Sequence, residues 1–224
     1  MKATSYNERL LPGCLLVLTF VTGLIDAAGF LAMGHVFTAN MTGNIVFLGF
    51  AFAGRPGLSA ARSLTALAFA MLGAMLARRL ETRFGERKSL WLAFAIGTEA
   101  ALFGASAIVV YALQRHTWPL LAVIALTALA MGVRNGTMRR LAIPEMTTTV
   151  LTLTLAALAF DFSWKPGDNP RWQRRTGSIL CMLLGAFTGA LLLRYSLALL
   201  LAVSALLSGA SAAIQKFCWK SRTG

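Results

Sequence analysis

The sequence predicts an all-α polytopic membrane protein, with about six transmembrane helices and two short re-entrant or broken helices. Of its 224 residues, 57% are apolar and only 13% are charged, whereas soluble domains carry about 25% charged residues. A soluble chain of this length needs more polar surface, and a disordered chain needs lower hydrophobicity. The second observation is that several apolar stretches reach the roughly 20 residues that a helix needs to cross a bilayer.

The long apolar stretches follow one another along the whole chain. They are Leu11–Leu31, Leu58–Ala77, Leu90–Leu113, Pro119–Met138, Gly177–Leu193 and Ser196–Ile214. The first is too long for the core of a cleaved signal peptide, and a second membrane segment follows it at once. We therefore expect residues 1–224 to form a single membrane domain.

Two further apolar stretches, Met41–Ala53 and Met146–Phe160, are too short to cross a bilayer comfortably. Each follows residues that disfavour a continuous helix in lipid, namely Gly34, His35, Thr38 and Asn40 before the first, and Pro144 and Glu145 before the second. The short stretches are either compressed spans, which gives eight crossings, or re-entrant half-helices, which gives six.

The distribution of basic residues favours six crossings, because Lys and Arg accumulate in cytoplasmic loops. Eight crossings divide the 21 basic residues 12 to 9, which is almost no bias. Six crossings divide them 17 to 4, and the minority side keeps only Arg55, Arg62, Arg115 and Arg194. We expect both termini in the cytoplasm. This arrangement explains the net charge of +13 without nucleic acid, and a basic surface for anionic lipid is a lesser interpretation of the same residues.

The two halves of the chain share three weak similarities in the same order. Gly23-x-x-Asp26 and Gly132-x-x-Asn135 come first, then Asn40-Met41-Thr42-Gly43-Asn44 and Glu145-Met146-Thr147-Thr148-Thr149, then Leu72-Gly73-Ala74 and Leu184-Gly185-Ala186. They predict a duplication, with repeat 1 over about 10–113 and repeat 2 over about 118–216. Three spans per repeat is an odd number, so the second repeat enters the membrane inverted. Paired short, interrupted segments in inverted repeats indicate a binding site of a secondary transporter.

Two stretches resemble the signature motifs of the YoaK-like family of bacterial integral membrane proteins, a family catalogued as a domain of unknown function. They are GLIDAAGFLAMGHVFTANMTGNIVFLG, from Gly23 to Gly49, and GVRNGTMRRLAIPEMTTTVLTLTLAALAFD, from Gly132 to Asp161. The resemblance covers nearly the whole chain. It implies a multi-pass protein of the bacterial inner membrane with about six spans, and it implies no established substrate, cofactor or catalytic residue.

Two carboxyl groups lie within predicted spans, where ionisable residues are costly and point to function. Asp26 is expected to relay a proton or cation, to anchor the re-entrant loop, or to cap or hydrogen-bond the broken backbone after Met41. Glu99 has no local partner in its span. Because burial favours the neutral carboxyl form, Glu99 either exchanges a proton during a cycle or is a neutral carboxyl bonded to a neighbouring helix.

The start of the first short helix is a second candidate region. Asn40 suits an N-cap position, and Thr42 and Asn44 are small polar groups able to face a cavity. Free N–H groups and the positive helix dipole at this end suit an anionic or carbonyl-bearing group. Most threonines of the second short helix are expected to bond back to the preceding turn, and Thr147 and Thr148 are the best placed of them to reach a pathway.

Three further residues complete the predicted solute or ion pathway. His35 is either a pH-sensitive group near the outer mouth or a loop residue that bonds backbone. Arg134 lies deep enough to pair with Glu145 or Asp26, although ordinary positive-inside anchoring also explains it. Asn135 is the counterpart of Asp26 in the second half.

Known enzyme motifs are absent from the sequence, and we expect no catalytic residue. Cys14, Cys181 and Cys218 lie far apart without metal-ligand spacing, so neither a metal nor another cofactor is expected. The expected partners are the lipid bilayer and an unidentified small solute or ion, and not nucleic acid. The sequence leaves a homo-oligomer open.

The predicted function is transport of a small solute or ion, coupled to protons through Asp26 or Glu99. A passive channel of the same architecture would need no titrating carboxyl group. A membrane chaperone, sensor or assembly partner is the alternative from another functional class, and its polar motifs would be structural. A membrane enzyme is disfavoured.

Overall fold

Six helices of the computed structural model are long and apolar enough to cross a membrane. The structure describes residues 4–85, 88–112, 120–141, 151–160 and 172–220, and none of these forms a strand. The long helices are α1 (Thr4–Leu31), α3 (Ala60–Phe84), α4 (Lys88–Ala112), α5 (Leu120–Leu141), α7 (Trp172–Leu192) and α8 (Leu197–Lys220). Each overlaps one predicted span, which confirms the all-α membrane fold.

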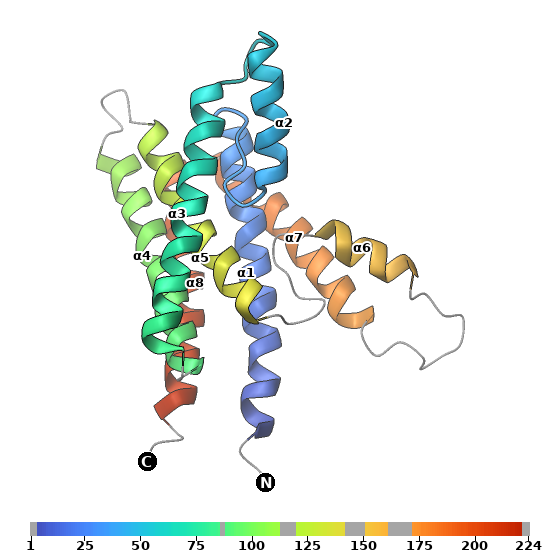
Figure 1. Cartoon of the computed structure of the whole chain (residues 1–224), viewed down its shortest axis with the longest axis vertical. Coiled ribbons are helices and arrows are strands. Elements are labelled where there is room, and N and C mark those ends of the chain that lie inside the picture. Colours follow the sequence, from blue (N-terminus) through green and yellow to red (C-terminus); the bar gives the residue numbers. More distant parts are fainter. Residues whose placement is uncertain (1–3, 86–87, 113–119, 142–150, 161–171, 221–224) are drawn as a thin grey trace.

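The two remaining described helices, α2 (Met41–Phe52) and α6 (Leu151–Phe160), are short. At 1.5 Å per residue, the 12 residues of α2 extend about 18 Å, well short of the roughly 30 Å hydrocarbon core. In Figure 1, α2 lies beside α3, with which it is in contact, and the ring centroid of Phe47 in α2 lies 6.3 Å from that of Phe30 near the end of α1. The first residues predicted for the second short helix, 146–150, lie outside the described residues, as do Pro144 and Glu145.

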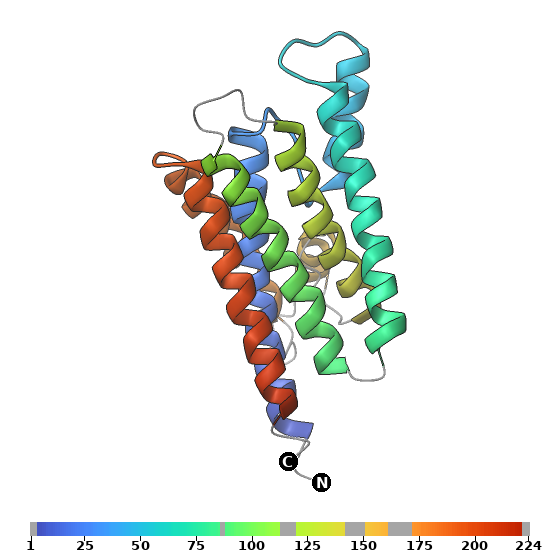
Figure 2. The ribbon, with the colours of Figure 1, turned by 90° about the vertical axis from the view of Figure 1, so that its left-hand side faces the viewer.

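The start of α1 and the end of α8 lie at one end of the bundle (Figure 1). Figure 2 shows α8, α4, α5 and α3 side by side in that order, and these neighbours are in contact. The helix pairs recur in a regular way. α1 packs on α7 and on α8, and α5 packs on α3 and on α4; α2 packs on α3, and α6 packs on α7. If α1, α2, α3 and α4 exchange places with α5, α6, α7 and α8 in that order, each of these contacting pairs becomes another contacting pair. The α4–α8 pair is unchanged by this exchange.

Glycines allow the closest of these contacts. A Cβ atom at Gly185 of α7 would lie 2.1 Å from the carbonyl oxygen of Phe20 in α1. A Cβ atom at Gly73 of α3 would lie 2.2 Å from the carbonyl oxygen of Leu129 in α5. Both helix pairs therefore pack backbone against backbone, which only a residue without a side chain permits.

Residues 32–40 form an irregular segment between α1 and α2, and Asn44 closes it. The Asn44 amide accepts a hydrogen bond from Phe37 N–H at 3.0 Å and donates one to the Phe37 carbonyl oxygen at 2.5 Å. Gly34 and His35 adopt positive φ angles of 84° and 60° in the turn. We call these two hydrogen bonds between Asn44 and Phe37 the Phe37 clamp. The expectation that Asn44 faces a cavity is wrong, because its side chain is fully buried in this clamp.

A buried ion pair lies in the centre of the bundle. Arg134 of α5 and Glu99 of α4 are 2% and 1% exposed. The Arg134 Nε–H donates to Glu99 Oε2 at 2.7 Å, and Nη2 bonds the second carboxylate oxygen. Ser208 of α8 also donates to that oxygen, at 2.6 Å. The Glu99 side chain therefore has partners on two helices.

The remaining donor group of Arg134 binds α1. Its Nη1 donates to the Leu18 carbonyl oxygen at 2.5 Å and to the Thr22 hydroxyl at 2.7 Å. The sequence suggested Glu145 or Asp26 as the partner of Arg134, but the structure pairs Arg134 with Glu99, and Glu145 lies outside the described residues. Glu99 bonds neighbouring helices, which was one of the two interpretations offered for it.

Removing one member of this pair should destabilise the protein strongly. Arg134→Gln or Glu99→Gln leaves the other charge buried without its partner, and we expect each to cost about 3–5 kcal/mol. Arg134→Met combined with Glu99→Leu should cost less than either single change. Thermal unfolding of the purified protein in detergent measures all three, and single variants that unfold at the wild-type temperature would contradict a central structural role.

Asn44→Leu should also destabilise the protein, because it leaves the N–H and carbonyl groups of Phe37 without partners. Each such buried group costs about 1–3 kcal/mol. Thr42→Val is the matched control, since Thr42 is an exposed residue of the same helix, and it should change stability by less than about 0.5 kcal/mol. Equal losses of stability in the two variants would exclude the clamp.

Candidate functional site

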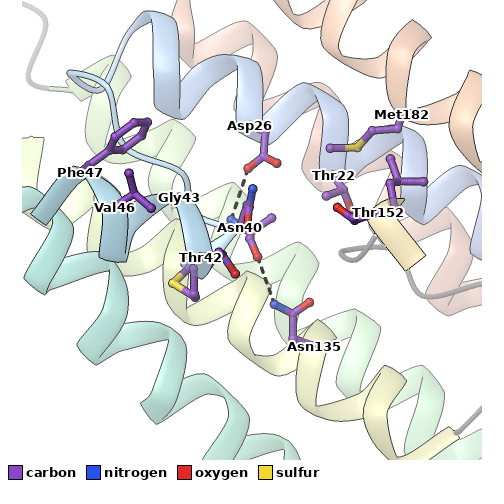
Figure 3. A pocket seen from close by; sticks show the side chains of 13 residues that line it. Thr22, Asp26, Asn40, Thr42, Gly43, Val46, Phe47, Asn135, Thr152 and Met182 are labelled. Atoms are coloured by element: carbon purple, nitrogen blue, oxygen red, sulfur yellow. Dashed lines mark hydrogen bonds between the residues drawn. The ribbon is translucent and has the colours of Figure 1, made fainter. Parts of the chain in front are cut away.

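A pocket of about 730 Å³ opens between both halves of the chain (Figure 3). Its volume is within the roughly 300–1,000 Å³ that is typical of small-molecule sites. Residues of α1, α2, α5, α6 and α7 and of the segment before α2 line it, namely Thr22, Asp26, Ala39, Asn40, Met41, Thr42, Gly43, Val46, Phe47, Asn135, Leu151, Thr152 and Met182. It therefore includes four of the residues singled out from the sequence.

Asp26 supplies the carboxylate of this pocket. It lies in the second half of α1 and is 8% exposed. Its Oδ1 accepts a hydrogen bond from the Ala39 N–H at 3.3 Å, and Figure 3 shows this bond. Among the described residues, no donor bonds its second oxygen. Asp26 thus both holds the segment before α2 and presents an oxygen to the pocket.

The N-terminus of α2 forms the adjoining wall. Asn40 is the N-cap, with φ −102° and ψ 90°, and its side chain makes no capping hydrogen bond. The first N–H groups of a helix have no partner within the helix, and they carry its positive dipole end. Because Asn40, Met41 and Thr42 line the pocket, this partial positive charge lies close to the Asp26 carboxylate.

Asn135 of α5 contributes from the other half of the chain. Its Nδ2 donates to the Ala39 carbonyl oxygen at 3.4 Å, and its buried Oδ1 has no partner among the described residues. The two residues that the sequence repeat equates, Asp26 and Asn135, therefore bind the N–H and the C=O of the same residue.

Four other predicted site residues lie outside the pocket lining. Glu99 and Arg134 form the central ion pair and do not line the pocket. His35 is exposed, with its ring edge-on to Phe30 at a centroid distance of 5.0 Å. Asn44 is buried in the Phe37 clamp. Thr147 and Thr148 lie outside the described residues.

Nine of the thirteen lining residues were not among the predicted site residues, and Thr22, Thr152 and Met182 are three of them. Thr22 lies one helical turn before Asp26, and this i, i+4 spacing on one helix face was a usable signal. Its hydroxyl accepts from Arg134, so it connects the pocket to the ion pair. Thr152 follows the two threonines chosen from the sequence, and no sequence feature marks Met182.

These groups suit a small polar solute or ion. One carboxylate favours a cation or a proton, while hydroxyl, amide and free N–H groups bind a neutral or negative part of the same solute. No cluster of three or more His, Cys, Asp or Glu side chains occurs in the described part of the chain, so the pocket lacks a typical metal-ligand set there.

Comparisons with known proteins agree with this architecture. Residues 14–214 match the family described as "Protein of unknown function (DUF1275)". The chain is also 37% identical over 166 residues to the UPF0700 transmembrane protein YoaK of Bacillus subtilis (strain 168), covering 73% of this chain and 70% of that protein. No solved structure matches the chain. Together with the six apolar helices, these matches show that the chain belongs to this YoaK-like family of integral membrane proteins.

Proposed function

We propose that the chain is a small-solute or ion transporter of the bacterial inner membrane, with its binding site in the pocket around Asp26. The observation that carries this proposal is the open carboxylate oxygen of Asp26 beside the N-terminus of α2. A buried charge is costly in a membrane protein and persists where it serves a pathway.

The pocket chemistry limits the solute. The Asp26 carboxylate attracts a proton, a metal cation or a protonated amine, and the free N–H groups of α2 attract an oxygen atom. A solute with a cationic and an oxygen-bearing end satisfies both. The size of the pocket suits a molecule no larger than an ordinary metabolite.

The helix arrangement supports an inverted repeat. Each contact between helices of α1–α4 has its counterpart in α5–α8, and the glycines of both close contacts belong to the repeated motifs. Three long helices in each half require the second half to enter the membrane in the opposite direction. Transporters built in this way alternate access by rocking one unit against the other around a fixed site.

Proton coupling is proposed for Asp26 and not for Glu99. Both oxygens of Glu99 bond Arg134, and one also bonds Ser208, so a proton would have to disrupt the central ion pair. The second oxygen of Asp26 can accept a proton from the pocket while Ala39 keeps its bond to the first. No enzymatic step is part of this proposal.

Asp26→Asn should keep the fold and abolish proton-coupled transport, because the amide oxygen still accepts from Ala39 but the side chain cannot ionise. A thermal-shift panel of amino acids, small amines, carboxylates and monovalent cations identifies a solute, since a bound solute stabilises by mass action. Uptake of that solute into proteoliposomes under a pH gradient then compares wild type and variant.

His35→Gln is the matched control, because His35 is the titratable residue of the same region outside the pocket. It should retain uptake and its pH dependence. If Asp26→Asn transports with the wild-type rate and pH dependence, Asp26 is structural. If the wild type moves none of the panel and instead co-purifies with another protein, the chain is an assembly partner and not a transporter.

Membrane orientation gives a separate test. With both termini in the cytoplasm, Arg55 should lie outside and Arg83, at the other end of α3, inside. Both side chains are exposed. Single Arg55→Cys and Arg83→Cys variants in a cysteine-free background are treated with a membrane-impermeant maleimide on intact spheroplasts. We expect labelling at 55 only, and labelling at 83 only would contradict the six-span orientation.

A further inference from the structure

We propose that a second pocket, between the adjoining ends of α3, α4 and α5, binds the phosphate group of an anionic phospholipid. This pocket has a volume of about 360 Å³ and lies apart from the Asp26 pocket, with no lining residue in common. Its lining residues belong to the second half of α3, the start of α4 and the end of α5, and these parts of the helices lie at one end of the bundle (Figure 2). The proposal does not depend on the transport proposal.

The pocket carries excess positive charge. Its wall includes Arg78, Arg139 and Arg140 against one carboxylate, Glu81. Glu81 bonds Arg140 and lies 3.6 Å from Arg78, while Arg139 has no ion pair among the described residues. Two positive charges are therefore left uncompensated. A phosphate group matches arginines well, because it accepts several charge-assisted hydrogen bonds at once.

Trp91 supplies an independent indication of a ligand. It lines the pocket from the first turns of α4 and is 4% exposed. Its indole Nε1–H is buried and has no acceptor in the described part of the chain. A buried donor without a partner costs free energy and calls for an explanation such as a bound ion. A phosphate oxygen that reached this N–H would supply an acceptor that the described part of the chain does not provide.

The surroundings favour a lipid as the source of the phosphate. Met71, Met75 and Arg78 follow the i, i+4, i+7 spacing of one helix face. The two methionines are 69% and 63% exposed and lie toward the middle of the apolar helix α3. An acyl chain can therefore run along α3 while its headgroup reaches Arg78. Basic pockets between transmembrane helices recognise headgroups in this way.

The test uses purified, delipidated full-length protein in detergent and native mass spectrometry. Phosphatidylglycerol and phosphatidylcholine with identical acyl chains are titrated separately. Arg78→Gln/Arg139→Gln removes two pocket charges and leaves the Arg140–Glu81 pair in place. Arg79→Gln/Arg83→Gln removes two charges from the same end of α3 without touching the pocket lining.

We expect phosphatidylglycerol to bind wild type at least about tenfold more tightly than phosphatidylcholine, given about a fivefold contribution per basic residue. The pocket variant should lose this preference, and the matched control should keep most of it. Equal binding of the two lipids, or equal losses in the two double variants, would overturn the proposal.

Trp91→Phe separates a ligand contact from a structural role. Without lipid, its unfolding temperature should fall only modestly, because the smaller ring leaves a cavity at this buried position while the lost Nε1–H has no partner among the described residues. Its affinity for phosphatidylglycerol should fall about tenfold, as for the loss of a hydrogen bond to a charged group. An unchanged affinity would remove Trp91 from the site and overturn the proposed geometry. If inorganic phosphate alone stabilises wild type as well as phosphatidylglycerol does, the ligand is soluble phosphate and the lipid assignment is wrong.

Discussion

The guanidinium group of Arg134 is the constraint around which the bundle is organised. It is fully buried, and its N–H groups donate hydrogen bonds to Glu99 on α4 and to Leu18 and Thr22 on α1. Ser208 extends the same network to α8. A buried charge tolerates little displacement of its partners, so these four helices keep a fixed relative register. Thr22 also lines the Asp26 pocket, and the rigid network therefore forms part of the wall of the site.

Much of the fold could be predicted from the sequence because membrane insertion depends on local properties. A span is recognised from the length of an apolar stretch, and the side of a loop is inferred from its basic residues. Asp26 and Asn40 could be placed near a pocket because a polar residue in or beside a span needs an interior position. The partner of Arg134 could not be predicted, because Glu99 is 35 residues away on another helix and their meeting depends on packing register. Asn44 could not be placed for a different reason, because its side chain bonds backbone groups seven residues earlier and this contact depends on the irregular path of residues 32–40.

In the Asp26 pocket, some polar atoms are hydrogen-bonded to the protein and others are open to a ligand. Asp26 and Asn135 bind the two polar groups of one peptide residue, Ala39, and so fix the start of α2 between α1 and α5. The second oxygen of Asp26 and the Oδ1 of Asn135 make no hydrogen bond among the described residues. Asp26 and Asn135 therefore both position α2 and offer oxygen atoms to a ligand. A ligand that binds these oxygens is linked in this way to the position of α2.

The central ion pair has a consequence for the biogenesis of the protein. During synthesis, α4 leaves the ribosome before α5, so the Glu99 side chain is made before the arginine that neutralises it, and Ser208 is made last of all. A helix carrying an isolated carboxyl group is a poor candidate for independent release into lipid. Pairing with Arg134 offsets this cost, so release of α4 into the bilayer is favoured once α5 lies beside it, and Ser208 adds its hydrogen bond after α8 is made.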